Sequence, residues 1–421
     1  MLAGSMLLYL LGVVALYGVE VLPDGERGLA YVAVHCGLTA LCGVIAWMLV
    51  RKGEAHARSV VALAVLARLL LLGVTPFTTH DVHRYTWDGR VALSGADPYR
   101  VSPKSMDARE LIEEGWYVAP EHQAYPTIYP PLALGLFSLS ALGGPVVAMW
   151  LWKCLVTLAS ILTVLLGWRV CVIRGCERHL VWVALHPLGL LESGVGAHLD
   201  TVAALGVAWA LWGWVQGRGV VVGVGLGLGI ILKLSPAVMV AGVIRDRTFR
   251  EVAWSVLCVV TLGYGIALAL GWHPVGSLPT FAQSWRFGST FDWLLSQFDL
   301  PRHRWTVPSV LVLGWGLFGW WGRRLDFPRL AQVFLGWLFF VSPVLFPWYL
   351  VVLLPLLSIA PSAILIGWLT VAPFTYEVID AFDVSGVWAP SEWPMWVTVV
   401  TLGMGGAIDY GRGFWTTSKN S

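Results

Sequence analysis

Charged residues are scarce in this sequence. They make up 12% of its 421 residues, whereas 57% are hydrophobic; a soluble domain carries about a quarter charged residues. The shortage argues against a soluble protein and predicts an integral membrane protein that is surrounded by lipid. The net charge of +2 is too small, and the basic residues too scattered, for a nucleic-acid partner to be expected.

Short motifs of common sites are missing as well. The six cysteines form no CxxC pair, so we expect buried small hydrophobes without a disulfide framework or zinc site. No HExxH or comparable histidine spacing is present, which argues against a metal site, and we expect no cofactor. There is no GxGxxG or Walker A motif, and the glycine string at 223–229 predicts close packing of an apolar helix instead.

Long apolar runs are abundant, and a helical span needs about 20 such residues. They predict an all-α integral membrane protein with about 12–14 transmembrane helices in a single multi-span domain, residues 1–421. We expect 4–22 to be a retained first span because it lacks the features of a cleaved signal peptide. The expected segments lie near 4–22, 28–50, 58–78, 128–142, 145–171, 179–192, 199–216, 219–244, 249–271, 307–322, 328–345, 347–360, 362–377 and 393–410.

Basic residues in short connections predict the orientation, since such connections stay inside. The residues expected inside are Arg51, Lys52, Arg58, Arg245, Arg247, Arg250, Arg323, Arg324, Arg329, Arg412 and Lys419. This assignment places loops 79–127, 272–306 and 378–392 outside. One connection disagrees, because Arg169, Arg174 and Arg178 then fall outside by parity. Either 128–142 or 179–192 is therefore not a full crossing, and the sequence leaves both alternatives open.

Loop 79–127 holds the densest cluster of titratable side chains. Its start predicts a helix over Asp81–Ser94 that ends at Gly95. In that helix one face carries four polar residues at helical spacing: Asp81, Arg84, Tyr85 and Asp88. A second short helix is expected at Asp107–Gly115, with Leu111, Ile112 and Trp116 lying on lipid.

Asp81 directly follows an apolar span and could accept a proton from an attacking hydroxyl, as a general base does. The alternative is that Asp81 and Arg84 form a local pair that anchors the loop, and the spacing does not decide between the two. For Asp88 and Arg90 we favour simple pairing in a rim helix.

Several polar residues stand inside apolar segments, where a charge costs roughly 2.5–3.5 kcal/mol on insertion scales. We expect them to face a protein-lined cavity. The cations available for an anionic leaving group are Arg84, Lys153, His198, Lys233 and Arg286. The expected pocket residues are His80, Tyr85, Asp88, Tyr129, Asp200, Trp348 and Tyr349. Glu192, His198 and Asp200 could form a proton or ion relay, although we favour mutual hydrogen bonding between helices.

The stretch DVHRYTWDGRVALSGADPY (81–99), followed by TIYPP (127–131), resembles the bacterial branch of the glycosyltransferase C superfamily. Within that superfamily it is similar to the polyprenol-phosphate-sugar-dependent mannosyltransferases of phosphatidylinositol mannoside and GPI assembly. Weaker matches follow in the expected order, HPLGLLESGVGAHLD, LKLSP and VSPVLFPWYLVVLLP, so that the likeness covers roughly residues 60–360.

The resemblance implies a multi-span helical fold and an inverting transfer of a hexose, most simply mannose. The donor would be a polyprenyl-phosphate sugar and the acceptor a lipid or glycan, at the outer face of a bacterial inner membrane, among its lipids. By position, the resemblance makes Asp81 the catalytic base. Some branches bind a divalent metal through a first-loop acid, but Asp81 and His83 do not form an Asp-x-Asp pair, which leaves metal dependence open.

Two other functions fit parts of the pattern. A lipid-linked sugar flippase or secondary transporter also needs buried charges and broken helices, but it would predict a pseudo-repeat between the two halves. No such repeat is visible, because the long polar loop occurs once and early. A non-catalytic scaffold of envelope assembly is the third alternative, and the density of titratable groups in one loop argues against it.

Overall fold

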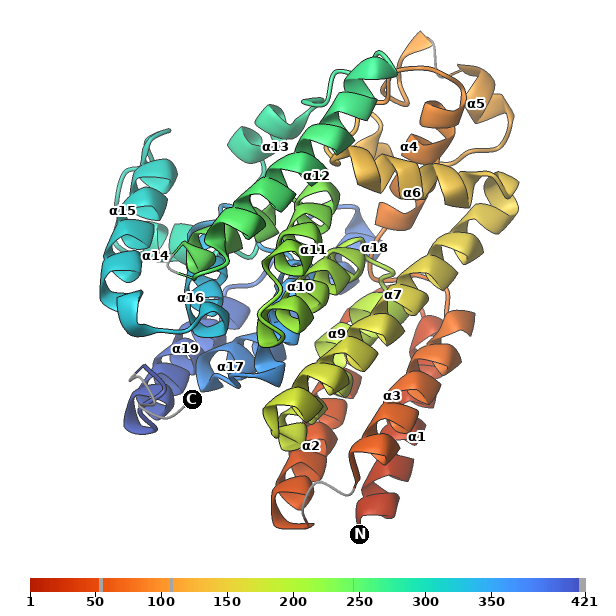
Figure 1. Ribbon diagram of the computed structural model, residues 1–421. Coiled ribbons are helices and arrows are strands. Elements are labelled where there is room, and N and C mark those ends of the chain that lie inside the picture. The colour runs from red at the N-terminus through yellow and green to blue at the C-terminus, as the bar shows by residue number, and fades with distance from the viewer. Residues whose placement is uncertain (53–55, 107–108, 245, 416–421) are drawn as a thin grey trace.

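The computed structural model describes residues 1–52, 56–106, 109–244 and 246–415. Within these ranges all regular secondary structure is helical, and one isolated β-bridge joins Phe287 to Val344. Figure 1 shows an elongated helical bundle. The predicted all-α class is therefore confirmed.

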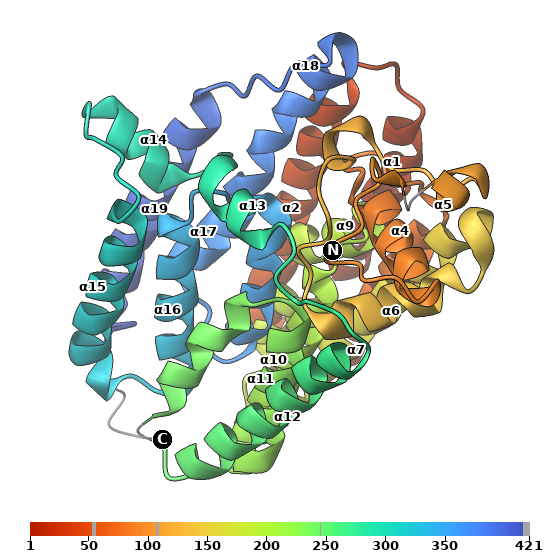
Figure 2. The same ribbon diagram turned by 90° about the horizontal axis from the view of Figure 1, so that it is seen from above.

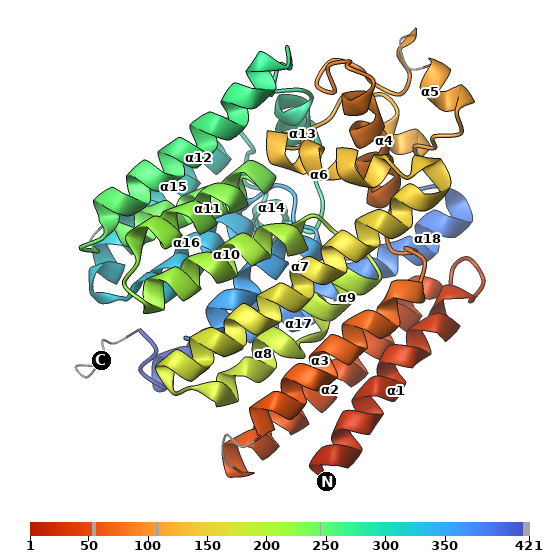
Figure 3. The same cartoon turned by 45° about the vertical axis from the view of Figure 1, so that its right-hand side comes forward.

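The first three helices pack beside a long helix, α7. They are α1 (Leu2–Glu20), α2 (Arg27–Lys52) and α3 (Ala57–Leu70), the last continued by η2 (Leu71–Gly73). They run alongside α7 (Gly144–Arg174) in Figure 3. The apolar run of α7 ends at Gly175, whose φ of +61° lets the chain leave the helix in the left-handed conformation.

The segment between α3 and α7 forms a cap at one end of the bundle (Figures 1 and 2). It consists of α4 (Asp81–Leu93), α5 (Arg109–Glu113), η4 (Pro120–His122) and α6 (Pro131–Ala141). α4 ends just before Gly95, which has a φ of +81°, as predicted. The predicted helix 107–115 is observed as α5, although Asp107 and Ala108 lie outside the described residues.

The expectation that the helix predicted at 107–115 and Trp116 beside it lie on lipid is wrong for two of the three apolar residues named. Leu111 and Trp116 are buried in a cluster that includes Trp87 and Val91 of α4, and Ile112 is exposed. Burial of the two side chains attaches α5 to α4 because apolar surface is removed from water on both. The cap is thus a packed unit around α4.

α6 is a short helix that bears on the conflict in orientation. Its 11 residues extend about 16 Å, too short to cross a membrane core of about 30 Å. In Figure 1 it lies across the end of α7. The C-terminal end of α7, with Arg174, consequently falls at the same end of the bundle as the C-terminal end of α2, with Arg51, and opposite the cap. This arrangement favours 128–142 as the segment that does not cross. Arg245, Lys419 and the Lys52 side chain lie outside the described residues.

Two predicted spans are interrupted helices. The segment 179–192 appears as η5 (Glu177–His179), α8 (Leu180–Ala184) and α9 (Pro187–Gly194). The segment 219–244 appears as α11 (Gly219–Leu232) and η6 (Ser235–Val243), with Lys233 in an extended conformation between them. Interrupted helices expose backbone and side chains inside the bundle, as sites in membrane proteins require.

The glycine string packs α11 tightly against α10 (Asp200–Val215). A Cβ atom on Gly225 would lie 2.6 Å from the backbone nitrogen of Ala210, and one on Gly206 would lie 2.8 Å from the carbonyl oxygen of Gly225. Any side chain at these positions would collide with backbone. The predicted close helix packing is confirmed.

The remaining elements complete the second half of the bundle. They are α12 (Phe249–Ala269), α13 (Leu278–Ser284), α14 (Thr290–Gln297), α15 (Thr306–Trp321), η7 (Gly322–Arg324), α16 (Phe327–Val341), η8 (Pro347–Ser358), α17 (Ala363–Val371), η9 (Ala372–Glu377), α18 (Val378–Ser385) and α19 (Trp393–Gly411). Among the described residues, five stretches are long and apolar enough to cross a membrane: Leu2–Glu20, Arg27–Arg51, Gly144–Arg174, Phe249–Ala269 and Ala363–Ser385. The chain is a multi-pass membrane protein.

An aromatic core fixes the position of α4. Tyr85 stacks on Phe137 of α6 with ring centroids 4.7 Å apart and meets the edge of Trp152 of α7 at 5.2 Å. Gly89 lies directly against the backbone of Phe137, where a Cβ atom would collide with the main chain. The N-terminal end of α4, with Asp81, is therefore held in a defined place.

Candidate active site

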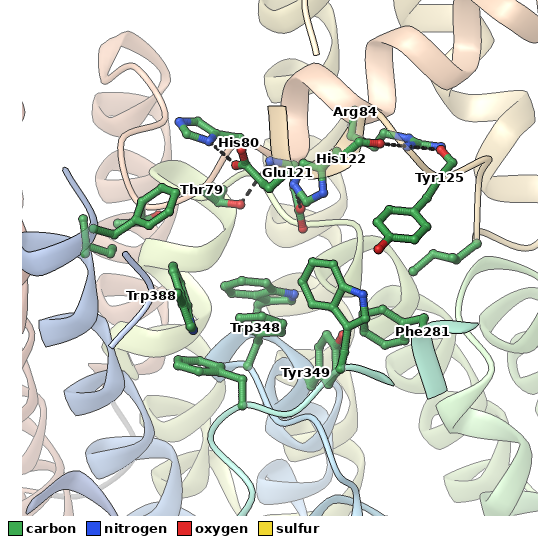
Figure 4. Close-up of a pocket in the computed structure, with 18 of the residues that line it drawn as sticks. Thr79, His80, Arg84, Glu121, His122, Tyr125, Phe281, Trp348, Tyr349 and Trp388 are labelled. Atoms are coloured by element: carbon green, nitrogen blue, oxygen red, sulfur yellow. Dashed lines mark hydrogen bonds and ion pairs between the residues drawn. The ribbon is translucent and has the colours of Figure 1, made fainter. Parts of the chain in front are cut away.

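One cavity of about 390 Å³ begins at the N-terminal end of α4. Its polar wall comes from α4, the residues before it and η4: Thr79, His80, Asp81, Arg84, Glu121 and His122. Its aromatic wall comes mainly from the second half of the chain: Phe281, Trp285, Phe287, Phe346, Trp348, Tyr349, Phe382 and Trp388. Figure 4 shows His80, Glu121 and His122 of the polar wall facing Trp348 and Tyr349 of the aromatic wall.

Asp81 lines the cavity between two histidines. Its Oδ1 lies 3.7 Å from Nε2 of His122, and its Oδ2 lies 3.6 Å from Nδ1 of His198. The hydroxyl of Tyr85 donates a hydrogen bond of 3.2 Å to Oδ2. The side chain is 16% exposed, so it reaches the cavity while its other sides are enclosed by protein.

The surroundings of Asp81 favour its ionised form. Burial acts to raise its pKa, but the interaction with His198, aided by His122 and Lys233, outweighs burial and lowers the pKa to about 2. Positive groups near a carboxylate stabilise its charge more than desolvation penalises it here. Asp81 is therefore an anion throughout the physiological pH range.

Arg84 does not pair with Asp81. Its Nε lies 2.9 Å from Oδ1 of Asp88, and both side chains are buried. Its Nη1 also donates to the carbonyl oxygens of His122, at 3.0 Å, and Tyr125, at 2.7 Å. The alternative in which Asp81 and Arg84 form a local pair is thus wrong, and Arg84 attaches α4 to η4 and to the residues after it.

Asp88 lies below the cavity wall and does not line the cavity. The expected pairing of Asp88 with Arg90 is also wrong, because Arg90 forms a salt bridge of 2.8 Å with Glu114 instead. Helical geometry explains the exchange: positions four apart face each other, and positions two apart do not.

Lys153 lies away from the cavity. Its ammonium group is buried and donates to the carbonyl oxygen of Leu71, at 3.2 Å, and to that of Val74. These carbonyls follow the end of α3, where helix groups lack partners within the helix. The structure does not support the predicted contact of Lys153 with a donor phosphate, since its donors are directed at the backbone.

Two of the predicted cations lie on or just behind the aromatic wall. Arg286 lines the cavity, is half-exposed, and forms a salt bridge of 3.2 Å with Asp292. Lys233 lies behind Tyr349, with its Nζ 4.3 Å from the ring centroid and 3.1 Å from Oδ2 of Asp200. Arg286 is consequently the predicted cation with the most open access to a ligand.

The predicted site residues therefore fall into two groups. Those that line the cavity are His80, Asp81, Arg84, Tyr129, Arg286, Trp348 and Tyr349. Those that lie outside its lining are Tyr85, Asp88, Lys153, His198, Asp200 and Lys233. In the second group, Tyr85 and His198 still touch Asp81 and form the layer behind it.

Sequence reasoning missed Glu121, His122 and Trp285. Glu121 pairs with His80 at 2.6 Å, and the hydrogen bond raises the pKa of that histidine. The ring of His122 is parallel to that of Trp285, with centroids 6.4 Å apart. All three belong to the two loops expected on the outer side, but no local spacing links them to Asp81.

A family model for the N-terminal domain of alpha-(1->6)-mannopyranosyltransferases, the MptA_B family, matches residues 7–245, more than half of the chain. The chain belongs to this family. The protein is a mannosyltransferase of the glycosyltransferase C type, as the resemblance implied. No curated protein and no solved structure matches it.

The family assignment decides between the functional classes. The mannosyltransferase is an enzyme that uses a sugar donor and an acceptor, so the transporter and scaffold alternatives are set aside. The matched residues include Asp81, His122 and His198, whereas most of the aromatic wall lies after residue 245. Both parts of the mannosyltransferase thus contribute to one cavity.

Proposed function

We propose that this mannosyltransferase moves mannose from a polyprenyl-phosphate donor to a hydroxyl of a lipid or glycan acceptor, with Asp81 as the general base. The observation that carries the proposal is the ionised Asp81 carboxylate on the polar wall, opposite aromatic rings. A base must reach the proton that it removes. Asp81 is the acid of the cavity lining whose neighbours leave its carboxylate facing the cavity.

The transfer is a single displacement. The acceptor oxygen bonds to the anomeric carbon, its proton passes to Asp81, and the bond between that carbon and the phosphate oxygen breaks. A retaining enzyme needs a second carboxylate about 5–5.5 Å from the first. The other acids of the cavity lining in the described part of the chain, Glu121 and Asp383, are directed at His80 and Arg27. A single displacement inverts the anomeric carbon, so an alpha product requires a beta-linked donor.

The two walls suit the two parts of such a donor. The aromatic wall offers apolar surface to an isoprenoid chain, and aromatic faces also stack on sugar rings. The departing phosphate is an anion that needs no proton but does need positive charge. Arg286 on the cavity lining provides it, and Lys233 adds to the positive potential behind Tyr349.

The distribution of basic residues supports an outer-face location for this chemistry. Basic helix ends, among them those with Arg51 and Arg174, gather at the end of the bundle opposite the cap. Because basic ends remain on the cytoplasmic side, this distribution supports a cap and cavity that face outward from a bacterial inner membrane.

The proposal is tested with the purified protein in liposomes. A polyprenyl-phosphate donor that carries labelled mannose is incorporated, and the products are identified by mass spectrometry. Labelled mannose on the acceptor together with free polyprenyl phosphate supports the proposal. Use of a soluble nucleotide-linked mannose in place of the lipid donor would contradict it.

Arg286→Ala weakens donor use more than acceptor use. Losing a charged contact to the phosphate costs about 1.5–3 kcal/mol, which corresponds to roughly a tenfold or larger rise in donor KM. The acceptor KM should change less than twofold. Both constants are obtained from initial rates at varied donor and acceptor concentrations.

Arg304→Ala is the matched control, since Arg304 lies over the ring of Trp305 in the same loop and does not line the cavity. It should leave both constants unchanged. Equal rises of donor and acceptor KM in Arg286→Ala would contradict the assignment of Arg286 to the phosphate.

Chelation of divalent metals leaves transfer unchanged. Among the described residues no group of three or more His, Cys, Asp or Glu side chains is arranged to hold a metal ion, and the sequence lacks an Asp-x-Asp pair at Asp81. The rate is measured after dialysis against EDTA and again after addition of Mg²⁺ or Mn²⁺. A rate that falls with EDTA and returns with either metal would show that a metal takes part.

A further inference from the structure

His198 stands between two carboxylates. Its Nδ1 lies 3.6 Å from Oδ2 of Asp81, and its Nε2 lies 3.4 Å from Oε2 of Glu192. The imidazole is fully buried and is absent from the cavity lining. It therefore does not touch a substrate in this arrangement, and any influence on the reaction has to pass through Asp81.

The two carboxylates decide the charge of the imidazole. A neutral histidine has one N–H donor and one nitrogen lone pair, so one of its two carboxylate neighbours would face the lone pair. An imidazolium presents a donor to each. The positive charge of the ring in that form lowers the pKa of the Asp81 carboxylate.

The backbone around His198 is built to hold it there. Ala197 has a φ of +48°, which is unfavourable for a residue with a side chain. The indole of Trp152 donates to the Ala197 carbonyl oxygen at 2.7 Å, and the His198 N–H donates to the Glu192 carbonyl oxygen at 2.9 Å. A Cβ atom on Gly196 would collide with the His198 ring. Local strain maintained by surrounding contacts is typical of functional sites.

Aromatic residues also hold the His198 ring and the Glu192 carboxylate in place. The His198 ring stacks on Trp348, with centroids 3.8 Å apart and planes 9° apart. The Tyr376 hydroxyl donates to Oε1 of Glu192 at 2.8 Å, which leaves Oε2 directed at His198. Trp348 lines the cavity, so the stack connects the buried imidazole to the aromatic wall.

We propose that His198, supported by Glu192, is a positioning residue that keeps the Asp81 carboxylate ionised and aims it at the cavity. This inference rests on the proposed role of Asp81 as the base. In the reaction the acceptor proton moves to Asp81, and no step of the transfer requires a proton from His198. The positive charge and the fixed ring, rather than a proton transfer, are what His198 contributes.

Other charges near Asp81 remain when His198 is replaced. The titratable groups that face Asp81 or His198 from the surrounding elements are His80, Tyr85, His122, Tyr129, Glu192, Asp200, Lys233, Tyr349 and Tyr376. Lys233 is paired with Asp200, which reduces its effect on Asp81. A change in pH dependence on replacing His198 therefore reports the loss of the imidazolium.

The test is the pH profile of kcat/KM for transfer, compared between the wild type and His198→Asn. The profile is measured from about pH 3 upward, and the wild type should show no acid limb above roughly pH 3, since the pKa of Asp81 is about 2. In His198→Asn the effect of burial, which raises the pKa of Asp81, is no longer offset by the nearest cation. The acid limb of the profile therefore moves up by about 1–3 pH units. At neutral pH the misplaced carboxylate lowers the rate by about 10–100-fold.

His186→Asn is the control for loss of a buried imidazole in the same segment. His186 accepts a hydrogen bond from the Leu188 N–H at the start of α9, and asparagine caps a helix equally well. Its pH profile should match that of the wild type. A matching profile for His198→Asn as well would overturn the proposal.

Glu192→Gln gives a second measurement if His198→Asn does not fold. It removes the carboxylate that faces Nε2 of His198, so the ring is held less firmly beside Asp81 and the acid limb should shift in the same direction by less; an unchanged acid limb would overturn the proposal. Asp81→Asn separates the two levels of inference. An active Asp81→Asn would refute the proposed base, whereas an inactive Asp81→Asn with a wild-type profile for the His198 and Glu192 variants would refute the positioning role alone.

Discussion

Asp81→Asn lowers mannose transfer by about 10²–10⁴-fold, the usual contribution of general base catalysis, and leaves the protein folded. Asparagine keeps the size of the side chain and the acceptor for the Tyr85 hydroxyl, but it has no basic carboxylate. The initial rate in liposomes is measured together with the yield and melting temperature of the purified variant. The loss should appear in kcat and not in donor KM.

Asp326→Asn is the control for replacing an aspartate by its amide. Asp326 caps the start of α16 by accepting a hydrogen bond from the Arg329 N–H, lies outside the cavity lining, and is replaced well by another capping residue. It should keep wild-type activity. A fully active Asp81→Asn would remove Asp81 from the role of base.

Arg84→Ala destabilises the cap by about 3–5 kcal/mol, because it leaves the buried Asp88 carboxylate without its partner. Burial already raises the pKa of Asp88 despite the neighbouring guanidinium. The variant also loses the hydrogen bonds from Arg84 to the carbonyls of His122 and Tyr125. We expect a clear fall in melting temperature and faster proteolysis of the segment between α4 and α6.

The double variant Arg84→Met with Asp88→Leu distinguishes this cause from a general loss of contacts. Replacing both members of a buried ion pair by apolar residues of similar size is often neutral for stability. Its melting temperature should recover toward that of the wild type, while transfer remains low because His122 is no longer anchored. A wild-type melting temperature for Arg84→Ala alone would contradict the importance of the Arg84–Asp88 pair.

The features that sequence predicted well depend on local spacing. α4, its end before Gly95 and the shared face of Asp81, Arg84 and Tyr85 all follow from helical periodicity and turn residues within one short stretch. Such signals are fixed by neighbours in the chain, so they require no knowledge of the tertiary structure.

The parts that could not be predicted depend on contacts between distant segments. Lys153 and Lys233 both look like cations in apolar helices, but the first meets backbone carbonyls at the end of α3 and the second meets Asp200. The loop residues Glu121 and His122 reach the cavity because η4 folds back beside α4. Sequence spacing contains no information on which distant partner a buried charge will find.

The length of an apolar run alone also does not show whether a segment crosses the membrane. The run 128–142 is apolar enough for a span, yet α6 packs across the end of α7 because the Tyr85–Phe137 stack and the Gly89 contact attach it to α4. These contacts hold α6 beside the cap. The basic residues Arg169 and Arg174, which conflicted with the predicted crossing, agree with this placement.

The most direct measurement of the central claim compares two synthetic donors, polyprenyl phosphates that carry mannose in beta or in alpha linkage, with the wild type and Asp81→Asn. A single displacement assisted by one carboxylate predicts that the wild type uses the beta-linked donor, forms an alpha-linked product, and loses this activity in Asp81→Asn. Formation of an alpha-linked product from the alpha-linked donor, or undiminished transfer by Asp81→Asn, would contradict the account.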